Sequence, residues 1–435
     1  MDTPNERLRE ARLRLVSPSG SGRVLSRPEL ADLINTYVHD YLSRTVEIDE
    51  NYIGKLERGQ IRWPSADYRT AFRAVLKADT DAEIGFFNTR RTRDTVGDVN
   101  RGAFLRGALA VGAGALVGVG EILPSAATVP VPERVGKAEI EFIRRASATF
   151  TTWDNAYGGD QARALVLNHL NWCSKLLTAK VADQDRPDLF SAVSSLAAVA
   201  GFMAFDALAH SDARRILEWA LACAEESGDW HLRAKTLSSM ARQEIWCGQA
   251  DQGLTYIEMA LVRADRLTAT ERAMLSTVRA RALAKWGRAR QQDTLTAVGL
   301  ADEQFTETRP DLDPASISFY DDPQHHGDTA HALFDLELVG RPTDAAQRLQ
   351  YAIAHHTSAF PRSKMFSQIK LSGLLMVTGD PREAAAVGHE AVDGAGTLRS
   401  PRSCRDLRDL LAHSQQHAGI PAVADLRRRV FELAA

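Results

Sequence analysis

Apolar residues recur every three or four positions through most of the chain, which is the period of an α-helix. Leu30, Ile34 and Val38 mark one face of a predicted helix near the N-terminus. Ser26 and Glu29 stand three positions apart at its start, which is the spacing of a capping box. The same helical period continues to the C-terminus, so the sequence predicts an all-α protein.

The stretch ENYIGKLERGQIRW (50–63) predicts a short helix with one apolar face. Asp49 is placed to cap its first turn, and Ile53 and Leu56 form the side that should be buried. Gly59 is a C-terminal stop, because glycine readily adopts the left-handed conformation that ends a helix. Pro64 starts a further predicted helix, whose inward residues are Tyr68, Phe72, Val75 and Leu76.

Glycine turns recur in the second half of the chain, each followed by a helix with a small residue on its inner face. The segments 186–205 and 212–229 predict an additional helix pair before them. A repeat of two antiparallel helices with a period near 40 residues indicates an α-solenoid of the tetratricopeptide type. The turn glycines are Gly248, Gly287, Gly340, Gly379 and Gly419, at steps of 39, 53, 39 and 40, and the long step contains an insertion.

These patterns divide the chain into a compact helical part (1–80), a connector (81–137) and a helical-repeat part (138–435). The connector contains an Ala/Gly-rich run, Ala103–Leu123, which is long enough to span a bilayer. It also holds five glycines and two charged residues. We therefore interpret the run as a closely packed small-residue helix and do not expect a membrane partner.

The formal net charge of the chain is −3, but the charge is unevenly placed. Residues 1–107 hold 18 Lys and Arg against 16 Asp and Glu, so this part is mildly basic. The N-terminus has no apolar secretory region, and a cytoplasmic location is expected. The four cysteines form no C-x-x-C pair, which favours free thiols over a zinc or redox site; they are Cys173, Cys223, Cys247 and Cys404.

Catalytic and cofactor motifs are missing from the sequence. It has no phosphate-binding loop, no G-x-S-x-G and no H-E-x-x-H, so an enzyme, a cofactor and a metal are not expected. His325, His326 and His331 are the densest metal-like group, but their spacing does not place three imidazoles on one helix face. They are kept as a weak effector-binding candidate. His355 and His356 are expected to face solvent.

The first 80 residues resemble the Cro/C1-type (Xre family) helix-turn-helix domain. The segments LREARLRL, SRPELADLI, YIGKLERG and WPSADYRTAFRAVL match its helices, and I-x-x-L-E-R-G-x-x-x-P is the most specific part. The whole chain is similar to actinobacterial regulators that join this domain to a tetratricopeptide-like region. One departure is that Leu30 and Ile53 lie 23 positions apart, which is more than the family shows. This predicts a longer second helix or an inserted loop.

The resemblance implies that the helix starting at Glu50 is a recognition helix, whose first residues meet base edges in the major groove. The implied base contacts are Glu50, Asn51, Tyr52 and Lys55. Asn51 suits adenine, Lys55 suits guanine or a phosphate, and Glu50 suits a cytosine amino group.

Contacts to the DNA backbone are implied for three arginines, Arg27, Arg58 and Arg62. An alternative for the end of the helix is a structural ion pair between Glu57 and Arg58, which is frequent in the family. Trp63 is expected in the core.

The resemblance implies a transcriptional regulator that binds a double-stranded DNA operator as a homodimer. Its helical-repeat part would dimerise or sense a peptide or small-molecule effector. The alternative is a protein-interaction scaffold that does not read DNA. The small positive charge of the N-terminal part and the acidic helix start favour this alternative, because Asp49 and Glu50 repel phosphate.

Overall fold

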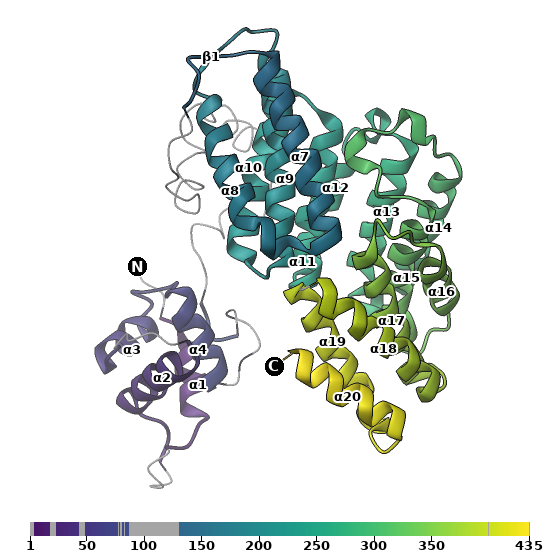
Figure 1. The fold of residues 1–435 in the computed structure, drawn as a ribbon. Coiled ribbons are helices and arrows are strands. Elements are labelled where there is room, and N and C mark those ends of the chain that lie inside the picture. Colours follow the sequence, from purple (N-terminus) through teal and green to yellow (C-terminus); the bar gives the residue numbers. More distant parts are fainter. Residues whose placement is uncertain are drawn as a thin grey trace. The chain divides into compact units, whose positions relative to one another are not determined.

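The computed structural model describes residues 4–17, 23–42, 48–76, 78, 81, 83–86, 130–398 and 400–434. In these residues the expected all-helical class is confirmed (Figure 1). One short parallel strand pair was not expected from the sequence: β1 (Arg134–Val135) pairs with β2 (Lys180–Val181). The chain separates into two compact units, 1–105 and 106–435, which we describe individually. The Ala/Gly-rich run lies outside the described residues, as does most of the predicted connector.

The first unit contains α1 (Glu6–Leu13), α2 (Arg27–Leu42), α3 (Glu50–Glu57) and α4 (Ala66–Leu76). The predicted capping box of α2 forms, because the Ser26 N–H donates to the Glu29 carboxylate at 2.8 Å and the Glu29 N–H donates to the Ser26 hydroxyl at 3.4 Å. The helix continues to Leu42, so of the two alternatives for this segment the longer second helix is present. Residues 43–47 lie outside the described part.

The core of the first unit is built from the residues that the helical period selects. Leu30, Ile34, Ile53, Leu56 and Phe72 are completely buried. Helix α2 packs against α3 and α4, while α1 packs against α3. α3 is thereby held from two sides, with its remaining surface left open.

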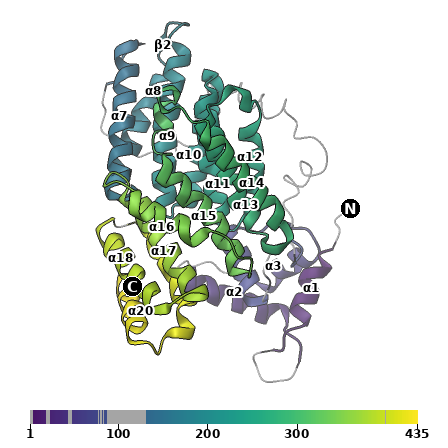
Figure 2. The same cartoon turned by 90° about the vertical axis from the view of Figure 1, so that its right-hand side faces the viewer.

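The second unit is a succession of paired helices (Figures 1 and 2). Its first helices are α7 (Lys137–Tyr157), α8 (Gly159–Leu176), α9 (Arg186–Asp206), α10 (His210–Ser227), α11 (Trp230–Trp246), α12 (Ala250–Leu261) and α13 (Ala269–Ala284). These continue into α14 (Gln291–Thr306), α15 (Asp322–Leu338), α16 (Ala345–His355), α17 (Pro361–Thr378), α18 (Pro381–Leu398), α19 (Pro401–His413) and α20 (Pro421–Ala434).

All five predicted glycine turns fall between the two helices of a pair. Gly248, Gly287 and Gly340 have φ values of 81°, 55° and 82°, the left-handed region in which glycine is favoured. Gly379 separates α17 from α18, and Gly419 precedes α20. The predicted pair before them is present as α9 and α10. The insertion forms two short 3₁₀ turns, Pro310–Leu312 and Ala315–Ile317, before α15 begins.

The pairs are arranged so that the first helix of each contacts the first helix of the next, from α9 through α11, α13, α15 and α17 to α19. Helix α7, at the start of the unit, also contacts α17 and α18 near its end. Buried apolar side chains form three successive clusters along this path. The first helices of the pairs, α9, α11, α13, α15, α17 and α19, therefore form one continuous layer. We call this layer the inner layer.

Helix α9 (Arg186–Asp206) is, within the described residues, the one helix long and apolar enough to cross a membrane. In the most apolar window of this helix, 67% of the residues are buried inside the protein. Its apolar surface is therefore mostly used in packing against neighbouring helices, above all α10.

Candidate functional site

Helix α3 begins and ends where local sequence signals place its limits. The Asp49 carboxylate accepts a hydrogen bond from the Tyr52 N–H at 2.8 Å, as an N-cap does. The hydrogen bond from the Tyr52 backbone lowers the pKa of Asp49, and a hydrogen bond from the Asn51 side-chain amide lowers it further. At the other end Gly59 has a φ of 74°. The Asp49 charge is thus engaged with the helix itself.

The two faces of α3 differ sharply. Ile53 and Leu56 are fully buried in the core of the first unit. Glu50, Asn51 and Lys55 are exposed on the opposite side, and the Asn51 amide donates to Asp49 at 3.2 Å. Half-buried Tyr52 packs its ring 5.6 Å from the Tyr68 ring of α4. The structure therefore gathers three predicted base-contacting residues on one open surface, with Tyr52 at its edge.

Glu57 fixes the end of α3 to two other helices. Its Oε1 atom accepts from Arg12 Nε of α1 at 2.8 Å, and its Oε2 atom lies 2.6 Å from Arg27 Nη2 of α2. Arg12 also donates to the Leu25 carbonyl at 2.6 Å. Burial acts to raise the pKa of Glu57, but the hydrogen bonds from Arg12 and Arg27 outweigh it and lower the pKa. α1, α2 and α3 are thus joined at one carboxylate.

This arrangement corrects two expectations. Glu57 pairs with Arg12 and Arg27, so the alternative ion pair with Arg58 is wrong; Arg58 is exposed, with its guanidinium beside Gly54. Trp63 is not a core residue, since 37% of it is exposed and Arg69 lies 3.8 Å from the ring centroid.

The three arginines predicted to contact phosphates are held differently. Arg27 is tied to Glu57 but keeps 42% of its side chain exposed. Arg62 is half-buried and donates from Nε to the Gly59 carbonyl at 3.3 Å. Arg58 remains exposed at the end of α3. The three side chains therefore stay accessible to differing degrees, and Arg27 has a structural role as well.

The three candidate histidines of α15 do not form one site. His325 is buried between the Tyr320 hydroxyl at 3.0 Å and Asp302 at 2.8 Å. His326 lies beside it, with ring centroids 5.9 Å apart. Both nitrogens of His331 are buried without a hydrogen-bond partner among the described residues.

Groups of three His, Cys, Asp or Glu residues able to hold a metal are also missing from the described part of the chain.

The partners of the buried His325 act on one another. Burial acts to raise the pKa of Asp302, but hydrogen bonds from His325 and Arg348 lower it strongly. His355 is exposed as expected, whereas His356 is 8% exposed, so the expectation of a solvent-facing His356 is wrong.

Ion pairs between distant helices are the main feature that sequence reasoning missed. Asp328 of α15 lies 2.7 Å from Arg242 of α11 and 3.4 Å from Arg281 of α13. Asp206 of α9 lies 3.1 Å from Arg402 of α19. The available signal was a charged residue within an otherwise apolar helix, such as the terminal Asp206 of α9. Its partners stand too far along the chain to be identified from spacing.

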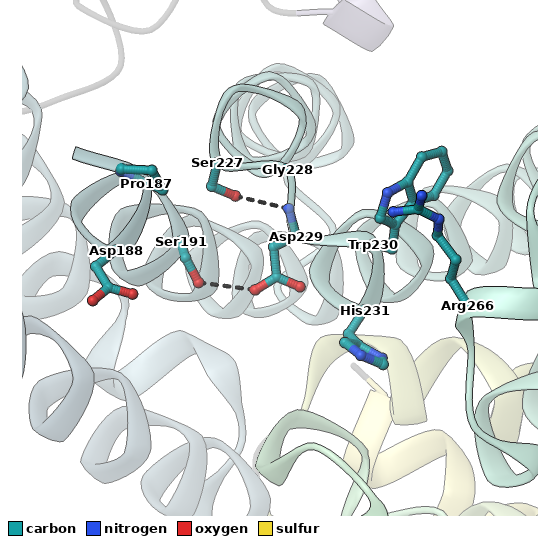
Figure 3. A pocket seen from close by; sticks show the side chains of 9 residues that line it. All are labelled: Pro187, Asp188, Ser191, Ser227, Gly228, Asp229, Trp230, His231 and Arg266. Atoms are coloured by element: carbon teal, nitrogen blue, oxygen red, sulfur yellow. Dashed lines mark hydrogen bonds between the residues drawn. The ribbon is translucent and has the colours of Figure 1, made fainter. Parts of the chain in front are cut away.

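A shallow pocket of about 510 Å³ opens at the start of α9 and α11 (Figure 3). Its polar groups are engaged with one another, because Ser191 donates to Asp229 at 2.9 Å and Asp229 caps α11. His231 pairs with Glu271 at 2.8 Å, and Arg266 lies over the Trp230 ring. The pocket is therefore a weaker ligand-site candidate than its volume suggests.

Comparison of the chain with protein-family models, with curated proteins and with solved structures found no match.

Proposed function

We propose that the protein is a sequence-specific DNA-binding transcriptional regulator with α3 as its recognition helix. The observation that supports this most is the division of α3 into two faces. Ile53 and Leu56 anchor the helix in the core, while Asn51 and Lys55 stand open near its start. A helix that lies in the major groove needs this combination of a fixed back and a polar, accessible N-terminal part.

The proposed roles follow from the chemistry of each side chain. The Asn51 amide both donates and accepts, which matches the N6 and N7 atoms of adenine. Lys55 donates to guanine or to a phosphate, and Glu50 accepts from a cytosine amino group. Arg58 and Arg62 contact phosphates, and Arg27 joins them while holding Glu57 in place.

The second unit is proposed to act as an α-solenoid of tetratricopeptide type that dimerises and senses an effector. The continuous inner layer from α9 to α19 supports this proposal. A homodimer presents two recognition helices about one helical turn of DNA, roughly 34 Å, apart. An effector with different affinities for two arrangements of the dimer would change DNA affinity. Four free cysteines, two of them buried, fit a reducing cytoplasm.

A protein-interaction scaffold is the second candidate, and the acidic Glu50 on the open surface of α3 favours it. Two results separate the candidates. The regulator predicts that purified full-length protein enriches one palindrome-like site from a random DNA pool. It also predicts that affinity for that site falls steeply with salt, because phosphate contacts release counterions.

The matched comparison uses three proteins in the same selection. The double variant Asn51→Ala, Lys55→Ala is expected to lose the site that the wild type enriches. Arg145→Ala is the control, because Arg145 lies on α7 of the second unit and its side chain is 78% exposed. Like the double variant, it removes one positive charge. Equal behaviour of all three proteins, with no enriched site, would favour the scaffold.

A further inference from the structure

In the middle of the inner layer of the second unit, a carboxylate of α15 lies between two arginines. Asp328 of α15 is 3% exposed. Its Oδ2 atom lies 2.7 Å from Arg242 Nη2, and its Oδ1 atom lies 3.4 Å from Arg281 Nη1. Three consecutive first helices, α11, α13 and α15, therefore meet at this carboxylate.

Two lysines of the inner layer lie near these groups, because the charges of Arg242 and Asp328 act on Lys235 and the charge of Lys370 acts on His331 of α15. Lys235 of α11 holds its Nζ atom 3.6 Å from the centroid of the Phe319 ring. Lys370 of α17 has its Nζ atom 4.7 Å from the Phe334 ring centroid. Among the described residues, neither lysine has a carboxylate within ion-pair distance. We call Lys235, Arg242, Arg281 and Lys370 the cationic cluster.

The other acidic groups nearby are already engaged. Asp335, on the same helix as Asp328, pairs with Lys285 at 2.7 Å. Asp302 pairs with Arg348 at 2.7 Å and with His325. Among the described residues, Asp328 is thus the one carboxylate within ion-pair distance of a member of the cationic cluster.

A cation without a counter-ion is unfavourable inside a protein, because a low-dielectric surrounding disfavours the charged form. Burial lowers the pKa of Lys235 to about 7, with Arg242 acting in the same direction and Asp328 opposing it. Burial, followed by the charge of Arg281, also lowers the pKa of His331 well below its ordinary value. The two ring nitrogens of His331 have no partner among the described residues. The cluster therefore holds donors and charge that its protein surroundings do not satisfy.

We propose that the cationic cluster is a binding site for the oxyanion, a carboxylate or a phosphate, of a small-molecule ligand. Arginine donors suit such an oxyanion because the guanidinium group offers several N–H donors in one plane. In the described part of the chain, Arg242 and Arg281 each donate one hydrogen bond, to Asp328. Their side chains keep 14% and 22% exposure. Among the described residues, none of their remaining guanidinium nitrogens belongs to the fully buried polar atoms without a partner.

The anion site deepens the effector role of the proposed function. Its regulatory consequence, a change in DNA affinity, rests on that proposed function. Anion binding itself does not require that α3 reads DNA. The shallow pocket beside Trp230 is the weaker candidate, since its Ser191, Asp229 and His231 side chains already have hydrogen-bond partners. An anion there would also meet Asp188 and Asp229.

The test is thermal unfolding of the full chain titrated with inorganic phosphate or with citrate, against chloride at the same ionic strength. The wild type is expected to show a saturable rise in Tm with at least one of the two, because a ligand that binds the folded state stabilises it. A response to phosphate alone identifies a phosphate site, and a response to citrate alone identifies a carboxylate site. No saturable response to either would overturn the proposal.

Three variants separate the site from a general salt effect. Arg281→Gln is expected to lose the rise in Tm, whereas Arg279→Gln, on the same helix but paired with Glu258 on the surface, keeps it. Asp328→Asn removes the competing carboxylate, so its rise relative to its own ligand-free Tm is expected to be larger than that of the wild type. The same rise in all four proteins would contradict the proposal.

Lys235→Gln provides a second route if Arg281→Gln fails to fold, since Lys235 has no ion pair to lose among the described residues. Its ligand-induced rise in Tm is expected to be at least halved. An unchanged rise in this variant would count against the cluster. Selection of a DNA site is measured separately, so a protein that binds the anion but no operator refutes the proposed function and leaves the anion site standing.

Discussion

At the scale of single residues, Glu57 shows how one carboxylate organises the first unit. It is 4% exposed and joins Arg12 and Arg27, which stand 45 and 30 positions away. Its lowered pKa means that the folded state binds a proton less readily than the unfolded chain. The stability that Glu57 contributes is therefore present above its unfolded pKa of about 4.3 and is lost as the pH falls through the folded value.

Glu57→Gln is expected to destabilise the first unit, because it leaves the buried Arg12 without its charge partner. The loss is about 3 kcal/mol, which corresponds to roughly 100-fold lower amide hydrogen-exchange protection in α2 and α3. Glu10→Gln is the control, since Glu10 is 63% exposed and its pair with Arg14 is on the surface. Equal protection in both variants would show that the Glu57 pairs contribute little.

The residue scale also shows what sequence can predict. Asp49, Gly59 and the Ser26–Glu29 box act within a few positions, so spacing alone locates them. The partners of Glu57 are brought by the packing of α1 and α2 against α3, and no local pattern selects Arg12 over Arg58 as its partner. The expectation for Trp63 also failed, because its ring lies beside the guanidinium of Arg69 at the surface and not in the core.

At the scale of elements, glycines in helices distinguish close packing from open surface. A Cβ added to Gly201 of α9 would lie 2.6 Å from Leu217 Cγ of α10, which is closer than two carbons can approach. A Cβ added to Gly299 of α14 meets nothing within 4 Å. The two residues are a matched pair for testing helix packing.

Gly201→Ala is expected to destabilise the second unit by about 1–3 kcal/mol through overpacking. Gly299→Ala is expected to stabilise it by about 0.5–1 kcal/mol, because alanine loses less backbone entropy in a helix. Denaturant unfolding of the full chain measures both. A stabilised Gly201→Ala would mean that α9 and α10 do not approach this closely.

The helix pairs illustrate which part of the fold was predictable. The turn glycines and the helical period located the five pairs that contain these glycines and the additional pair before them, because each pair is a local unit of about 40 residues. The contact of α7 with α17 and α18 could not be predicted, since it depends on small rotations accumulated over successive pairs. The arrangement as a helix-turn-helix domain followed by a solenoid remains a prediction.

At the scale of the whole second unit, a buried ion cluster joins its beginning to its end. Arg362 of α17 lies 2.6 Å from Asp154 of α7 and 3.7 Å from Asp206 of α9. Arg402 of α19 lies 3.1 Å from Asp206, which is fully buried. Residues more than 150 positions apart are held together by these charges.

Asp206→Asn is expected to weaken this closure, because it leaves Arg402 without its carboxylate and reduces the neutralisation of Arg362. Breaking such a buried pair costs about 3–5 kcal/mol, measured as a lower denaturant midpoint of the second unit. Asp188→Asn is the control, since the pair of Asp188 with Arg144 is half-exposed and contributes under about 1 kcal/mol. A midpoint equal to that of the control would indicate that apolar packing alone closes the unit.

The central claim is that α3 reads bases, and base-by-base specificity tests it most directly. Affinities of the wild type and Asn51→Ala would be measured for the selected site and for each of its single-base variants. We expect Asn51→Ala to lose discrimination at one A·T pair, by about 1–3 kcal/mol, while every other position keeps its preference. A uniform loss across all positions, or no loss at all, would contradict the assignment of α3 as a recognition helix.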